Sequence, residues 1–194
     1  MKILLIVLAS ILTVADVYYI CKTSEKRILS GILSVASMLI CALIALLRNI
    51  NGMYTALLFI IVAIMNIIVD SDLKTQYISN LLLIVLNSVC LVAAFFVPNG
   101  NIFVSIIVAW AITGICFLIG KKSKGSIGTG DLFCMSGLMM STSFTGLMNF
   151  IFMSLFSGTV YGLVSLILKK KTLKTEIPFA PFLLIGYLCM VFYI

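Results

Sequence analysis

The chain has 194 residues, of which 63% are hydrophobic and only 10% are charged, with 13 Lys and Arg against six Asp and Glu. A soluble domain carries about a quarter charged residues, so this composition, with a mean hydropathy of +1.29, excludes a soluble protein and indicates an integral membrane protein. Because the chain contains no His, a Ser-His-Asp triad, a His-containing zinc protease site and a His-ligated haem are excluded as well.

Eight apolar segments are each predicted to form a membrane helix, since a span needs about 20 apolar residues. In chain order they are residues 3–21, 28–47, 53–69, 80–97, 102–120, 132–144, 147–168 and 178–194. Short polar links join them, and no linker or internal repeat divides the chain. We therefore expect one all-α domain, residues 1–194, built as a polytopic transmembrane bundle of about eight helices.

The basic residues indicate how these helices are oriented. The loops after the first, third, fifth and seventh segments hold three, one, three and four Lys or Arg, whereas only Lys2 and Arg48 fall on the opposite side. Positive loops stay in the cytoplasm, so both termini are expected outside a plasma membrane and these four loops inside. Cleavage of the first segment as a signal peptide would invert that pattern, so we expect this helix to be retained. We interpret the net charge of +7 as a consequence of how the helices are oriented in the membrane. We therefore expect membrane lipid as a partner and no nucleic acid.

The six cysteines are scattered in or beside apolar segments and form no Cys-x-x-Cys pair. This pattern argues against a zinc site or a disulfide framework. We expect them to be buried as small apolar residues, and we predict neither a metal nor a cofactor.

Four of the six acidic residues lie in or beside the predicted spans: Asp16, Asp70, Asp72 and Asp131. Ionisable groups are costly there and often mark functional sites. Each has a simpler interpretation too. Asp16 can pair with a nearby Lys or support helix packing, and Asp70 and Asp72 can be solvated charges at a helix end.

Asp131 stands in the string Gly128-Thr129-Gly130-Asp131, directly before an apolar segment. Glycine permits close approach of another backbone, so this turn can let an extended substrate lie beside a carboxylate. The alternative is that Asp131 only caps the following helix.

Asp72 precedes Asp131 by 59 residues, and the predicted topology puts both on the cytoplasmic face. Two carboxylates that converge on one water and share one proton are the minimum apparatus of an aspartic protease. Two residues along a helix rotate a side chain by about 200°, so at most one of Asp70 and Asp72 can face Asp131.

Three stretches of this sequence resemble the type IV prepilin peptidases, which belong to the GxGD membrane aspartyl proteases. Residues 72–80 (DLKTQYISN) are similar to the family's first motif, and residues 128–132 (GTGDL) to its GxGD motif. Residues 177–183 (IPFAPFL) resemble its late Pro-Phe-Gly-Pro-Phe segment. The resemblance covers about residues 53 to 194. It chooses Asp72 over Asp70 as the partner of Asp131, because the spacing from Asp72 to Asn80 matches the motif.

The resemblance implies an aspartic endopeptidase that acts on prepilin-like proteins, removing a short cytoplasmic leader where the substrate's helix meets the membrane. A bond at this border is easier to unwind and hydrate than one inside the bilayer. Ser79 stands where the family usually has Pro, and Ala180 where it has Gly. The loop between the first two segments is short, so we expect the compact, peptidase-only type without methyltransferase activity.

Pro178 and Pro181 open the last segment. Proline has no backbone N–H, so carbonyls nearby lack their usual donors, which can shape a substrate groove near the two acids. The alternative is that the prolines merely mark a helix start.

Other functions also remain open at this point. Membrane carboxylates serve small transporters, and an assembly partner without enzymatic activity would need none of this chemistry. A presenilin-like protease shares GxGD, but the Tyr-Asp of its first motif is absent here. The Ser79 departure leaves an inactive peptidase homologue as the last alternative.

Overall fold

The computed structural model describes Val14 and residues 27–48, 52–98, 100–122, 128–168 and 177–191. These residues form seven helices: α2 (Arg27–Arg48), α3 (Gly52–Thr75), α4 (Asn80–Ala94), α5 (Ile102–Lys122), α6 (Thr129–Met140), α7 (Phe144–Ile167) and α8 (Ala180–Val191). Each helix matches one predicted apolar segment, so the predicted all-α bundle of about eight helices is confirmed. The first predicted segment, with Asp16 and the retained first helix, lies outside the described residues.

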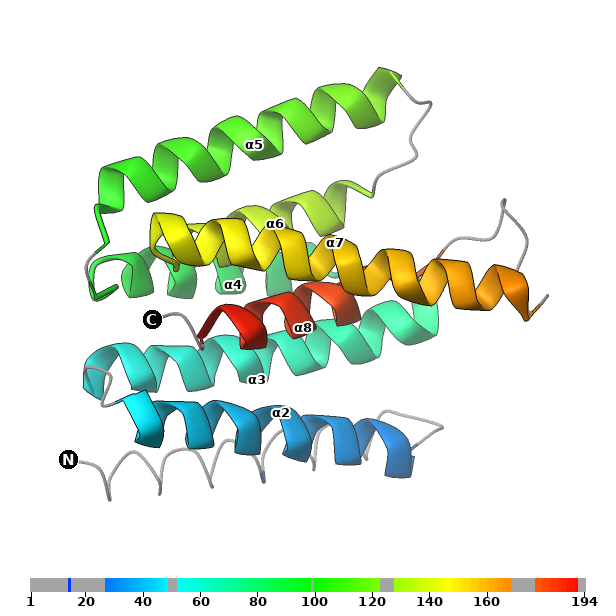
Figure 1. Ribbon diagram of the computed structural model, residues 1–194, viewed down its shortest axis with the longest axis horizontal. Helices are drawn as coiled ribbons and strands as arrows, with labels where there is room; N and C mark the ends of the chain where they lie inside the picture. The colour runs from blue at the N-terminus through cyan, green and yellow to red at the C-terminus, as the bar shows by residue number, and fades with distance from the viewer. Residues whose placement is uncertain are drawn as a thin grey trace.

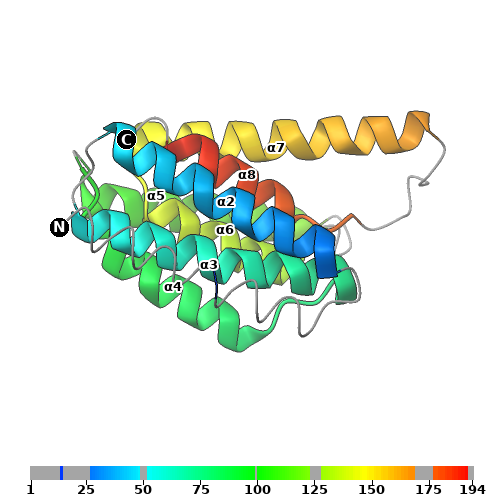
Figure 2. The ribbon, with the colours of Figure 1, turned by 90° about the horizontal axis from the view of Figure 1, so that it is seen from below.

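Consecutive helices alternate in direction along one common axis (Figure 1), and the view from below shows the same arrangement (Figure 2). Not all neighbours in sequence are neighbours in space, because α6 packs against both α4 and α5. Because the directions alternate, the end of α3 and the starts of α4, α6 and α8 lie at one end of the bundle. The predicted motifs fall on these helix ends, so the topology gathers them in one region.

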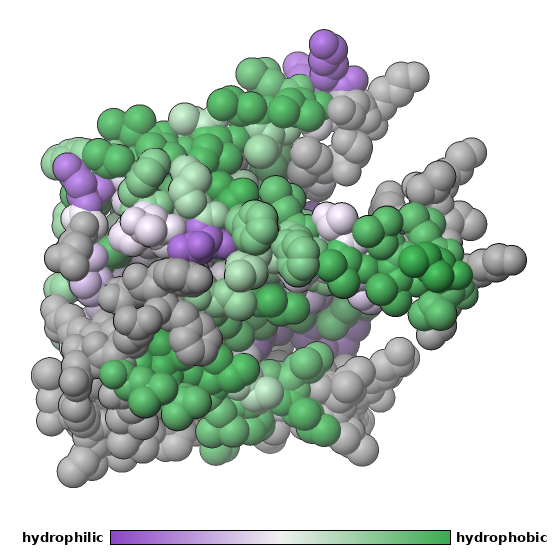
Figure 3. All heavy atoms as spheres, viewed as in Figure 1, coloured by the Kyte–Doolittle hydropathy of each residue, from purple (hydrophilic) through white to green (hydrophobic). Residues whose placement is uncertain are grey.

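Helix α3 is the central helix, packed against α2, α4 and α8. Within its most apolar 18-residue window, 67% of the residues are buried inside the protein, against 17% for α5 and α7. Figure 3 shows hydrophobic side chains over most of the outer surfaces of α5 and α7, with a small hydrophilic patch near the start of α7, as expected for helices that mainly face lipid. Among the described helices, α3, α5 and α7 are long and apolar enough to cross a membrane. This finding supports the membrane assignment.

Hydrophobic residues from all seven described helices form one core. Three of the cysteines, Cys41, Cys90 and Cys134, are fully buried in it as predicted. Cys116 and Cys189 are half-buried, and Cys21 lies outside the described residues.

Helix α6 is short because a polar turn ends it. The Ser141 carbonyl accepts a hydrogen bond of 2.7 Å from the Tyr54 hydroxyl, and the Thr142 carbonyl accepts one of 2.9 Å from the Ser105 hydroxyl. These bonds satisfy carbonyls that the end of a helix leaves without intrahelical donors. They tie the far end of α6 to α3 and α5, so its first turn is held at the end of the bundle that carries the motifs.

Helix α3 continues six residues beyond the predicted span, which ended at residue 69. Polar residues end the apolar window there but not the helix, because Asp70 forms an ion pair with Lys74 one turn later. Gln76 ends the helix with a left-handed φ of 52° and donates its N–H to the Asp72 carbonyl at 3.0 Å. Asp70 and Asp72 are therefore helical residues rather than loop residues.

Candidate active site

A cavity of about 240 Å³ lies where α3, α4 and α6 meet at this end of the bundle. Asp72, in the last turns of α3, and Asp131, in the first turn of α6, both line it. Gly128 and Gly130 line it as well. The two carboxyl groups are close enough to interact electrostatically. Of the six residues predicted to form the site, these four line one cavity, whereas Pro178 and Pro181 do not.

The Gly-Thr-Gly-Asp string forms the start of α6. Gly128 is the N-cap residue, and its carbonyl accepts a hydrogen bond of 3.3 Å from the N–H of Leu132. Asp131 is therefore the third helical residue and not the cap. Its buried Oδ1 atom has no hydrogen-bond partner among the described residues, so this oxygen is able to accept a hydrogen bond from a ligand.

The two glycines of this string differ in their surroundings. A Cβ atom added to Gly128 would lie 3.0 Å from Oδ2 of Asp131, which is tighter than ordinary contact. A Cβ added to Gly130 would meet Ile78 at 3.5 Å, an ordinary van der Waals distance. The close approach that a glycine permits is therefore needed at Gly128, beside the carboxylate.

The start of α8 reaches Asp72. The backbone N–H of Ala180 donates a hydrogen bond of 3.0 Å to Oδ2 of Asp72. The Phe179 carbonyl accepts the first helical bonds, from Phe182 and Leu183, which makes Ala180 the first helical residue. The N–H groups of a helix's first turn have no intrahelical acceptor, so this donor is free to bind the carboxylate, and the positive end of the helix dipole points at it.

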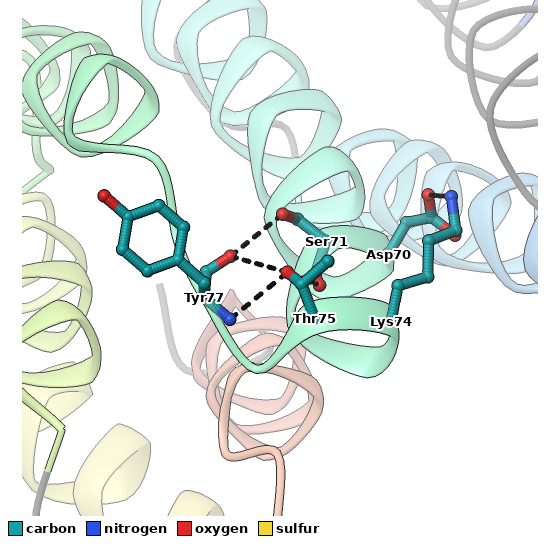
Figure 4. Close-up of polar contacts among 5 residues, drawn as sticks. All are labelled: Asp70, Ser71, Lys74, Thr75 and Tyr77. Atoms are coloured by element: carbon teal, nitrogen blue, oxygen red, sulfur yellow. Dashed lines mark hydrogen bonds and ion pairs between the residues drawn. The ribbon is translucent and has the colours of Figure 1, made fainter.

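Asp70 lies on a different face of α3. Its carboxylate forms the ion pair with Lys74, and Figure 4 shows this pair on the opposite side of the helix from Tyr77. Asp70 lines a second cavity, of about 220 Å³, between α2, α3 and α8. Asp72 and not Asp70 therefore shares a cavity with Asp131, in agreement with the limit that helix geometry sets. The catalytic role that the resemblance implies for Asp72 stays a prediction.

Two hydroxyl groups hold the loop that follows Asp72 (Figure 4). Ser71 Oγ and Thr75 Oγ1 donate to the Tyr77 carbonyl at 3.0 and 3.2 Å, and the Tyr77 N–H donates to Thr75 Oγ1 at 3.3 Å. These bonds fold the loop back over the end of α3. Ile78 is consequently buried against Gly130, while Tyr77 lines the cavity and stays 64% exposed.

Ser79 occupies the position where the resemblance leads one to expect Pro. It is the N-cap residue of α4, with φ −63° and ψ 131°, and its side chain makes no capping hydrogen bond. This φ is the one that a proline ring imposes. The backbone of Ser79 is therefore compatible with proline, although serine stands here.

The two prolines take a different place from the acids. Pro178 precedes α8, and Pro181 is its second residue and lines the second cavity with Asp70. Neither is among the described residues that line the cavity of Asp72 and Asp131. A role for the two prolines in shaping a substrate groove near the acids stays a prediction, and the cavity that Pro181 lines contains Asp70 rather than the acid pair.

Sequence reasoning did not identify Ala180 as a ligand of Asp72, because the group that binds is its backbone N–H. It also missed Asn80, Leu83 and Phe133, which line the cavity beside the acids. The positions of Asn80 at the end of the first motif and Phe133 after the GxGD string were the available signals.

The arrangement can support acid–base chemistry on a bound water. One carboxylate of a close pair can accept a proton from the water while the other, protonated, donates to an oxygen of the ligand.

Comparison with models of known protein families also indicates a peptidase. A family model of the type IV leader peptidases matches residues 56–163, more than half of the chain. The chain belongs to the type IV leader peptidase family. The matched range includes both Asp72 and Asp131, whereas α8, which supplies the Ala180 donor, lies beyond it. No curated protein and no solved structure matches the chain significantly.

Proposed function

We propose that the protein is an aspartic endopeptidase of the plasma membrane that removes the short cytoplasmic leader of prepilin-like proteins. The observation that carries this proposal is the pairing of Asp72 and Asp131, from two separate helices, in one cavity at one end of the bundle. The membership of the chain in a leader-peptidase family supports the substrate class. The excess of basic residues in the loops that follow the odd-numbered predicted segments supports a position on the cytoplasmic side.

In the proposed mechanism the two aspartates share one proton. The Ala180 N–H bond favours a negative charge on Asp72. Asp131, whose Oδ1 has no donor among the described residues, holds the proton. Asp72 takes a proton from the attacking water, and Asp131 gives its proton to the oxygen of the scissile carbonyl. The tetrahedral diol then collapses: Asp131 takes a proton from one of its hydroxyl groups as the C=O bond re-forms, the C–N bond breaks, and the proton on Asp72 passes to the leaving amine, which restores the starting state of the pair.

The test is a cleavage assay in membranes. The enzyme is co-expressed with a panel of prepilin-like proteins, each with a short polar leader followed by an apolar helix, and the new N-terminus is identified by mass spectrometry. The wild-type chain should cleave at least one panel member at the membrane border, and Asp131→Asn should abolish cleavage while the protein remains in the membrane. Cleavage that persists in Asp131→Asn would refute the aspartic mechanism.

A further inference from the structure

A larger cavity, of about 610 Å³, lies beside the candidate active site, between α4 and α5. Both helices pack against α6, which forms the floor between them. Helix α5 contributes Ile106 and Trp110, and α4 contributes the residues of one face: Asn80, Leu83, Ile84, Asn87, Ser88 and Leu91. We call this cavity the lateral groove.

The lateral groove is continuous with the cavity of the two aspartates. Asn80, Leu83 and Phe133 line both. Of these, Asn80 is the first residue of α4 and Phe133 lies two residues after Asp131. An occupant of the groove that reaches its Asn80 end therefore arrives next to the carboxylates.

The walls of the lateral groove favour an apolar occupant. Its two inner polar side chains are already bonded within the protein: Asn87 donates to the carbonyls of Leu83 and Phe133 at 2.8 and 3.1 Å, and Ser88 donates to the carbonyl of Ile84 at 2.8 Å. The Ile84 side chain is 67% exposed and that of Trp110 is 50% exposed. These apolar side chains are open to a partner.

The groove also has the length of a helical segment. The 12 residues from Asn80 to Leu91 span about 17 Å of helix, that is 11 rises of about 1.5 Å, which is more than half of the roughly 30 Å hydrocarbon core. An apolar helix lying along α4 would fill the groove through the leaflet nearest the aspartates and end at Asn80.

We propose that the lateral groove binds the membrane helix of the substrate and thereby places the peptide bond at that helix's end beside Asp72 and Asp131. This inference rests on the proposed function and adds the subsite that holds the substrate. A lipid chain or a helix from a second copy would also be apolar, but neither has a bond to present to the carboxylates.

The first test uses cross-linking to the panel member that the wild-type enzyme cleaves. A photo-reactive phenylalanine analogue replaces Trp110 in the groove or, as control, Phe152, a 64% exposed aromatic residue of α7 that does not line it. Both variants carry Asp131→Asn so that the substrate stays intact. The expected result is a cross-link from position 110 to the substrate helix that is at least fivefold stronger than from position 152.

The second test compares two substitutions on α4. Ile84 and Leu81 are equally exposed, 67% and 68%, but only Ile84 lines the groove. Ile84→Trp should lower kcat/KM for the same substrate at least fivefold, mainly through KM, whereas Leu81→Trp should change it less than twofold.

The outcomes separate the two proposals. If the substrate is cleaved but cross-links equally from both positions, or if position 110 cross-links to a second copy or to lipid, the groove assignment is wrong and the proposed function stands. If Ile84→Trp and Leu81→Trp behave alike, the groove assignment is likewise overturned. If the wild-type chain cleaves no panel member, the proposed function fails and this inference fails with it.

Discussion

The Ala180 N–H binds Oδ2 of Asp72 at 3.0 Å and joins two stretches of chain that are 108 residues apart. It brings the start of α8 to one aspartate, while the start of α6 carries the other. Two helix N-termini, each with a partial positive charge, thus converge on the carboxylate pair. This arrangement stabilises a single negative charge shared between two groups that cannot both ionise cheaply at close range.

Ala180→Pro is expected to lower kcat/KM by about 10- to 150-fold. Proline is favoured at the first position of a helix, but it removes the N–H that binds Asp72. A hydrogen bond to a charged group contributes about 1.5–3 kcal/mol, which corresponds to that range. The measurement is the initial rate of leader cleavage in membranes, with protein level checked by immunoblot.

Ala180→Gly is the matched control, because it keeps the N–H and removes only a methyl group. It should retain most of the activity. Equal losses in both variants would show that packing of the fully buried Ala180 side chain matters, and not its donor.

Asp72→Asn should lower cleavage by at least about 10²-fold, the minimum commonly seen when an acid–base group is lost. Asp70→Asn should retain most activity, because Asp70 is paired with Lys74 on another face of α3 and lines a different cavity from Asp131. The two variants are compared in the same membrane assay, and an inactive Asp70→Asn beside an active Asp72→Asn would reverse the assignment.

Gly128→Ala should lower kcat by several-fold without removing the protein from the membrane. Its new methyl group would lie 3.0 Å from Oδ2 of Asp131, so the carboxylate has to move. Misplacing a reacting group by about 1 Å can cost about 10²-fold in rate, so the smaller shift required here should cost several-fold.

Gly130→Ala serves as the control, since its methyl group meets Ile78 at an ordinary 3.5 Å and alanine is the better helix former. Its effect on kcat should be smaller than that of Gly128→Ala. The reverse order would place the critical close approach at Gly130.

Gly186→Ala should destabilise the bundle by about 1–3 kcal/mol, the usual range for overpacking. The new methyl group would lie 2.8 Å from the Phe150 carbonyl oxygen on α7, a backbone atom that cannot rotate away. Gly114→Ala on α5 is the control, because nothing lies within 4 Å of the new atom. Thermal unfolding in detergent should show a lower midpoint for the first variant only.

The helices and the face that carries the site were predictable because both depend on local patterns. Apolar windows mark the spans, and the positions of Asp72 and Asp131 after odd-numbered spans put both at one end of an up-and-down bundle. The extension of α3 was not predictable from hydropathy, since Asp70 looks like the end of a span until its pairing with Lys74 is known. The hydrogen bond from Ala180 to Asp72 could not be predicted from side-chain chemistry, because its donor is the backbone N–H of Ala180. The face on which Pro181 lies depends on how α8 rotates against α3, which the sequence does not show.

The last prediction concerns the one clear departure from the first motif. Ser79→Pro should preserve both cleavage and stability, because Ser79 already has φ −63° and its side chain makes no capping bond. Proline also lowers the conformational entropy of the unfolded chain, so the free energy of unfolding should rise slightly, by about 0.4–1 kcal/mol, where the native backbone suits proline. Tyr77→Pro is the opposing control two residues earlier. It removes the N–H that binds Thr75. A proline at position 77 also favours an extended backbone with negative φ at the preceding residue, whereas Gln76 has a φ of 52°. The unfolding midpoint and the cleavage rate of the two variants decide the matter. If Ser79→Pro is as damaging as Tyr77→Pro, the serine has a role that its backbone conformation does not explain.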